Sequence, residues 1–97
     1  MTAKAPTYPK GDLRRMLAVL AAIDALGPDA TLVKISALSS VDKKTVGALI
    51  GAAVAQAGMT ITKDGPTYSI ESWGPVIAKK GAKLALTGAL NAPIVNP

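Results

Sequence analysis

The sequence contains no cysteine and no histidine among its 97 residues. Without cysteine the chain can form neither a disulfide bond nor a thiolate metal site. Without histidine it lacks the side chain that most often acts as a general base near neutral pH. Its six carboxylates are scattered, and no glycine-rich phosphate loop follows a predicted strand. These absences argue against an enzyme, and nothing in the sequence indicates a metal, a cofactor or a small-molecule ligand.

Aromatic residues and long apolar runs are scarce too. Tyr8, Tyr68 and Trp73 are the only aromatic residues, and alanine supplies much of the hydrophobic composition. Small side chains remove little apolar area from water, so a core built from them is marginal in a monomer and favours a homodimer. No stretch is long enough to span a membrane, and residues 1–10 lack the apolar core of a signal peptide. We therefore expect a cytoplasmic protein without membrane contact.

Positive charge, by contrast, is in excess. The chain has 11 lysines and arginines against 6 aspartates and glutamates, which gives a formal net charge of +5. A basic surplus on a small domain favours polyanionic partners such as nucleic acid, and it also fits a merely solubilising surface. Charge alone leaves both interpretations open.

Capping residues and apolar spacing predict the first helix over residues 13–26. Asp12 stands where an N-terminal cap is needed, and Gly27-Pro28 ends the helix. Apolar side chains recur on one side of this helix at Leu13, Met16, Leu17, Leu20 and Ile23. Arg14 and Arg15 project from the other side.

Two further helices and a hairpin are expected over residues 31–70. A short strand at Thr31–Val33 precedes a helix at Ile35–Ser40, and Val41 forms the turn before the Asp42 cap. The next helix runs to Ala57 and stops at Gly58. It turns toward the core the residues Val46, Leu49, Ile50, Ala53, Val54 and Ala57. The alternating segments 59–62 and 67–70 then predict a β-hairpin around Lys63–Pro66, the residues of its turn.

A last helix is expected over Val76–Leu90, interrupted by Gly81 and Gly88. It carries a lysine cluster that could bind phosphate groups, consisting of Lys79, Lys80 and Lys83. Its apolar residues have no evident surface to cover within the chain, which indicates a dimerisation segment. Trp73, just before it, is expected to fill the core.

The residues Ile35-Ser36-Ala37-Leu38-Ser39-Ser40-Val41-Asp42-Lys43-Lys44-Thr45-Val46 carry a family resemblance. Their spacing resembles the helix-turn-helix of winged-helix DNA-binding domains of bacterial transcription regulators. Ser40 replaces the glycine that this family usually has in the turn, and Asp42 replaces its capping serine. The resemblance implies an α+β fold with an extended arm at 1–10, a winged-helix domain at 11–74 and a C-terminal helix and tail at 75–97.

The resemblance also implies a partner and a site. The partner is double-stranded DNA, and the protein is a small transcription regulator or an accessory protein of a mobile element. Helix 42–57 enters the major groove with Lys43, Lys44 and Thr45 leading, followed by Ala48 and Ala52. Phosphate contacts come from Lys63 in the wing and from the pair Arg14 and Arg15.

The same helix face also fits a second role. It offers no arginine, asparagine or glutamine, the side chains that read base edges best, so sequence discrimination is expected to be low. A smooth surface of Gly47, Gly51 and Ala55 also suits close packing of one helix against another. The alternative is therefore a winged-helix protein-interaction module without sequence-specific DNA binding.

Overall fold

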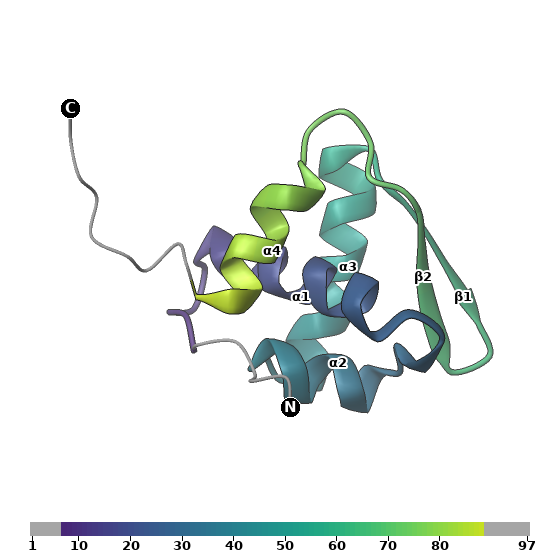
Figure 1. Cartoon of the computed structure of the whole chain (residues 1–97), viewed down its shortest axis with the longest axis horizontal. Coiled ribbons are helices and arrows are strands. Elements are labelled where there is room, and N and C mark those ends of the chain that lie inside the picture. The colour runs from purple at the N-terminus through teal and green to yellow at the C-terminus, as the bar shows by residue number, and fades with distance from the viewer. Residues whose placement is uncertain (1–6, 89–97) are drawn as a thin grey trace.

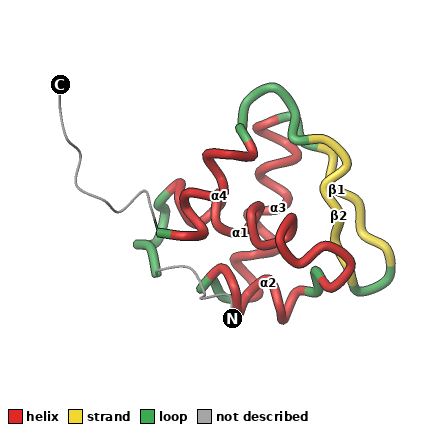
Figure 2. The backbone as a smooth tube through the Cα atoms, in the orientation of Figure 1, coloured by secondary structure: helices red, strands yellow, loops and turns green. Residues whose placement is uncertain are grey.

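The computed structural model describes residues 7–88 and has four α-helices and one antiparallel hairpin, shown in Figures 1 and 2. This arrangement confirms the expected α+β class. In chain order the elements are α1 (Leu13–Leu26), the 3₁₀ turn η1 (Gly27–Asp29), α2 (Leu32–Ser39), α3 (Lys43–Ala57), β1 (Thr60–Asp64), β2 (Thr67–Ser72) and α4 (Lys79–Thr87).

Helix α1 is the centre of the fold. Its residues Ala18 to Ile23 are all buried, and six consecutive buried positions mean that this middle part of the helix is enclosed on every side. Helices α2, α3 and α4 and strand β2 all pack against it. Asp12 caps the helix as expected, accepting a hydrogen bond from the backbone N–H of Arg14 at 2.8 Å.

The expected strand at Thr31–Val33 is wrong. Leu32 and Val33 form the first turn of α2, and the Thr31 hydroxyl accepts a hydrogen bond from the backbone N–H of Lys34. Thr31 makes only a single antiparallel bridge, to Thr67. This cap satisfies a backbone N–H in the first turn of a helix, which favours helix over strand at these residues. Helix α2 therefore begins at Leu32 and not at Ile35.

The hairpin forms where the sequence predicts it. Lys63 pairs with Tyr68 and Asp64 with Thr67, and the ladder has an irregularity at Thr60. Gly65 supplies the positive φ that the turn needs. Strand β2 faces α1, so one side of the hairpin lies against the helical core.

The C-terminal helix differs from the expectation in its extent, and part of its apolar surface is covered within the chain. Helix α4 begins only at Lys79, includes Gly81 without interruption, and ends at Gly88 in the left-handed conformation. Leu90 lies outside the described residues. Ala82, Ala85 and Leu86 are buried in the core against α1, so the segment has an intramolecular surface after all. The small side chains of α4 and of α1 allow the two helices to approach closely.

The segment before α1, which was expected to be an extended arm, contributes a residue to the core. Tyr8 is only 4% exposed and its hydroxyl donates a hydrogen bond to the backbone carbonyl of Ala85. Burial raises the pKa of the Tyr8 phenol, which therefore stays protonated and able to donate at neutral pH. Residues 1–6 of the expected arm lie outside the described part.

Most of the expected core is in place. Leu20, Ile35, Val46, Ile50, Ala53 and Ala57 are buried, while Leu17, Leu38, Leu49, Ile61 and Trp73 are partly buried and pack against them. Val54 is the exception, because it is 42% exposed. At 100° per residue it lies 100° around α3 from Ala53 and 60° from Ala57, at the edge of the buried side of the helix.

Two classes of feature are absent from residues 7–88. No helix there is long and apolar enough to cross a lipid bilayer. The same residues contain no group of three or more aspartate, glutamate, histidine or cysteine side chains placed to hold a metal ion.

Candidate nucleic-acid interface

A tight turn joins α2 to α3 and fixes the start of α3. Ser40 has φ 59° and ψ 33°, the left-handed conformation that glycine usually supplies. The Ser36 hydroxyl donates a 2.6 Å hydrogen bond to the carbonyl of Val41, which ties α2 to the turn. Nothing in the sequence pattern singles out Ser36 for this role. The turn therefore holds the N-terminal end of α3 at the surface in a defined direction.

Asp42 and Thr45 close the N-terminus of α3. The backbone N–H of Thr45 donates to Asp42 Oδ2 at 3.0 Å, and its hydroxyl donates to Asp42 Oδ1 at 2.7 Å. These bonds lower the pKa of the Asp42 carboxyl, so it stays ionised at neutral pH. The Thr45 hydroxyl proton is engaged in the cap, and only its oxygen remains able to accept a bond from a ligand.

Two ammonium groups flank this cap. Lys43 and Lys44 are exposed, and neither has a carboxylate within ion-pair distance in the described part of the chain. We call this pair the α3 basic end. Long side chains that are free at the start of a surface helix can reach phosphate oxygens.

Beyond the α3 basic end the exposed side of α3 is flat. Gly47, Ala48 and Gly51 are exposed and Ala52 is half-buried. A Cβ atom added at Gly47 or at Gly51 would meet no atom within 4 Å. Glycine inside a helix costs roughly 0.5–1 kcal/mol relative to alanine. No close contact within residues 7–88 requires glycine at these two positions. A partner could approach the helix backbone more closely at a glycine than at a larger residue.

The two arginines do not join the α3 basic end as free cations. Arg14 lies over the ring of Tyr8 at 4.7 Å and bonds the Asp12 carboxylate at 2.6–2.9 Å. This bonding lowers the pKa of Asp12 to about 2. Arg15 is largely covered, with a side chain only 16% exposed, and its Nη2 lies 3.8 Å from Asp42 Oδ1. The Arg14 guanidinium therefore binds the cap at the N-terminus of α1, and the Arg15 guanidinium lies beside the cap of α3.

The hairpin lysine stands apart as well. Lys63 lies over the ring of Tyr68 at 5.5 Å, and together with Leu32 and Val33 it borders a hollow beside the first turn of α2. The α3 basic end adjoins the other end of α2, which is about 12 Å long. The structure thus brings Lys43, Lys44 and Thr45 together but leaves Lys63 at a separate edge.

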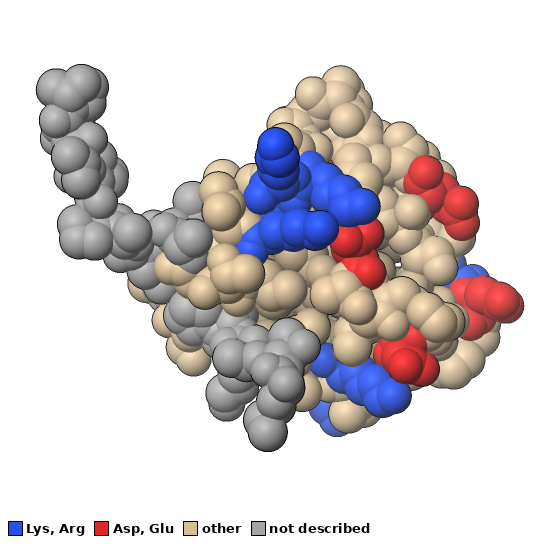
Figure 3. Space-filling view, viewed as in Figure 1, with Lys and Arg blue, Asp and Glu red and all other residues tan. Residues whose placement is uncertain are grey.

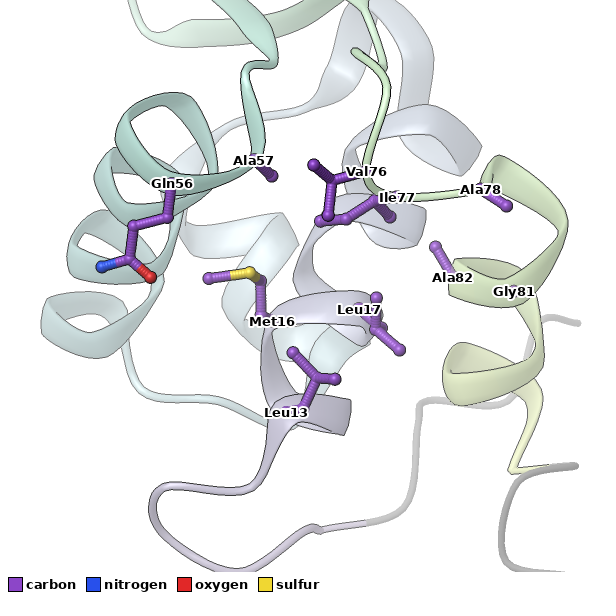
Figure 4. A pocket seen from close by; sticks show the side chains of 10 residues that line it. All are labelled: Leu13, Met16, Leu17, Gln56, Ala57, Val76, Ile77, Ala78, Gly81 and Ala82. Atoms are coloured by element: carbon purple, nitrogen blue, oxygen red, sulfur yellow. The ribbon is translucent and has the colours of Figure 1, made fainter.

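An apolar cleft of about 380 Å³ lies between α1, the end of α3 and the start of α4 (Figure 4). Gln56 is the one polar side chain among its lining residues, and Leu13 and Val76 at its border are 66% and 67% exposed.

The homodimer expected from the sequence remains a prediction. Helix α4 packs its inner face on α1, and this cleft is an apolar surface that remains open to such a contact in residues 7–88.

Comparison with known proteins gives no family for the chain. No family model, no curated protein and no solved structure matches it.

Proposed function

We propose that the protein is a winged-helix protein that binds double-stranded DNA, with α3 lying in the major groove. The observation that carries the proposal is the exposed, capped start of α3, where Lys43 and Lys44 stand unpaired beside a side of the helix that has no bulky side chain. Phosphate contacts by these lysines would supply affinity. Small residues behind them would let the helix backbone come close to the bases.

The order of elements supports the same proposal. A short helix, a turn with a left-handed residue, a second helix and a hairpin follow one another between residues 32 and 72. The departures are the reduction of the first strand to one bridge at Thr31 and the separation of Lys63 from the α3 basic end. The proposal therefore gives the hairpin lysine a minor share of the binding.

The expected selectivity is low. Bidentate base contacts need arginine, asparagine, glutamine or lysine at the base edges, and beyond Lys44 the exposed side of α3 presents mainly glycine and alanine. We assign the protein to sequence-tolerant DNA binding in regulation or in the maintenance of a mobile element, without an enzymatic step. Arg14 and Arg15 act here by holding α1 and the α3 cap.

Replacing Lys44 with alanine tests the proposal. The variant is expected to bind every duplex more weakly by a similar factor, and the slope of log K against log salt should fall by about one unit, because one phosphate contact is lost. Fluorescence anisotropy with two duplexes of unrelated sequence measures both quantities. Lys34→Ala is the matched control, because Lys34 is an exposed lysine on α2 and not on α3. Its Nζ lies 4.0 Å from Asp29 Oδ1, so within residues 7–88 it already has a carboxylate partner, unlike Lys44. Equal affinity of the Lys44 variant and the parent at low salt would contradict the proposal.

The glycines of α3 give a second test, in which stability and binding move in opposite directions. The double variant Gly47→Ala/Gly51→Ala is expected to raise the free energy of unfolding by roughly 1–2 kcal/mol, because both sites are open and helical. It should bind DNA more weakly, because the added methyl groups hold the helix away from the groove. Urea unfolding and anisotropy provide the two measurements.

Gly81→Ala is the control for this test, because Gly81 is also an open helical glycine but lies in α4. It should stabilise the protein and leave DNA affinity unchanged. If the double variant in α3 gains stability and keeps the affinity of the parent, the exposed side of α3 does not lie against DNA.

A further inference from the structure

A second group of basic side chains lies on α4. Lys79, Lys80 and Lys83, which we call the α4 lysine face, are all exposed. Figure 3 shows basic side chains gathered over α4, separated by acidic side chains from another basic group at the lower edge near α2. Lys79 Nζ lies 3.4 Å from Asp24 Oδ1 on α1. Within residues 7–88, Lys80 and Lys83 have no carboxylate at ion-pair distance.

The position of these lysines opposes helix stability. They occupy the first two turns of α4, where the positive end of the helix dipole disfavours cations. The first turn contains no acidic residue, and Ala78 offers no side-chain cap. Lys79 and Lys83 are also spaced i, i+4, so they repel one another on the same side. The contact with Asp24 accounts for Lys79, but neither packing nor capping accounts for Lys80 and Lys83, whereas an anionic partner would.

The α4 lysine face lies far from the α3 basic end and points elsewhere. Gln56 and Ala57 border the same cleft as Gly81 and Ala82, so α4 begins beside the C-terminal end of α3. The α3 basic end is at the opposite end of that helix, about 20 Å away along its axis. Because α3 and α4 both bury their inner sides on the enclosed helix α1, their exposed sides point in different directions.

We infer that the α4 lysine face binds the phosphate backbone of a second DNA duplex, so that one protein molecule bridges two duplexes. The inference rests on the proposed function, because the first duplex is the one held by α3. Because the exposed sides of α3 and α4 point in different directions, a duplex held by α3 leaves the α4 lysine face open to a second duplex. Lys80 and Lys83, one turn apart and without internal partners, supply the second contact.

A two-duplex capture experiment with the full chain tests the inference. One biotinylated 30-base-pair duplex is fixed on beads, and a fluorescent duplex of unrelated sequence is recovered from solution at low salt. The double variant Lys80→Gln/Lys83→Gln should recover at least about 10-fold less fluorescent duplex, while its affinity for a single duplex changes by less than about threefold. Lys34→Glu is the control, since it lowers the net charge by the same two units on α2 and should bridge like the parent.

The outcomes separate this inference from the proposed function. If Lys44→Ala reduces single-duplex binding and Lys80→Gln/Lys83→Gln reduces only bridging, both hold. Unchanged capture by the α4 variant would overturn the bridging inference and leave α3 binding intact. A fall in single-duplex affinity and salt slope in the α4 variant would also overturn it, because the α4 lysine face would then contact the same duplex as α3. Retained bridging together with lost binding to phosphatidylserine–phosphatidylcholine vesicles would assign the face to an anionic membrane instead.

Discussion

The variant Ile50→Asp is expected to be unfolded at room temperature. Ile50 is 7% exposed and lies in the core with Val46 and Ile35. The buried cluster that contains Ile50 has no cationic member within residues 7–88, so a carboxylate at this position must either stay charged at high cost or take up a proton. Together with the lost apolar contact, the change should cost about 3–5 kcal/mol, which is comparable to the whole stability of a small domain. Circular dichroism during urea titration measures the loss.

Val54→Asp is the matched control for this variant. Val54 lies on the same helix, one turn after Ile50, but is 42% exposed. A carboxylate there stays hydrated, and the free energy of unfolding should change by no more than about 1 kcal/mol. The pair tests which side of α3 faces the core. Cooperative unfolding of the Ile50 variant at the same urea concentration as the parent would contradict the assignment.

The variant Tyr8→Ala is expected to have the second largest effect. Tyr8 is 4% exposed, bonds the carbonyl of Ala85 and carries the Arg14 guanidinium on its ring. Removing a buried aromatic ring leaves a cavity at the junction of α1 and α4 and should cost about 3–5 kcal/mol. Thermal unfolding followed by circular dichroism gives the change, and α4 should lose its protection from amide hydrogen exchange together with the rest of the core.

Tyr8→Phe separates the ring from the hydroxyl. It keeps the packing and loses one hydrogen bond, so it should cost about 1 kcal/mol. A loss as large as that of the alanine variant would assign the stabilisation to the hydroxyl and not to the ring. Stability equal to the parent in both variants would mean that the chain before α1 contributes nothing to the fold.

Elements whose signals are local could be predicted from the sequence. Asp12 and Asp42 cap helices with their own side chains, and Gly58 ends α3 because it adopts a positive φ without strain. The hairpin also follows from a few adjacent residues, with Gly65 at its turn. The candidate site at Lys43 and Lys44 belongs to this class, since exposure at a helix start follows from helical periodicity alone.

Features that depend on partners far apart in the sequence could not be predicted in this way. Tyr8 is buried in the core, where its hydroxyl bonds the carbonyl of Ala85, a residue 77 positions later in the sequence. Part of the apolar side of helix α4 is covered because it packs against α1, whose alanines allow a close approach of the two helices. Arg14 is held by local bonds to Asp12 and by the ring of Tyr8, whereas Arg15 is drawn toward the α3 cap at Asp42, a group that periodicity does not place beside it. Periodicity reports how each helix exposes its sides, but which sides meet depends on packing among helices far apart in the chain.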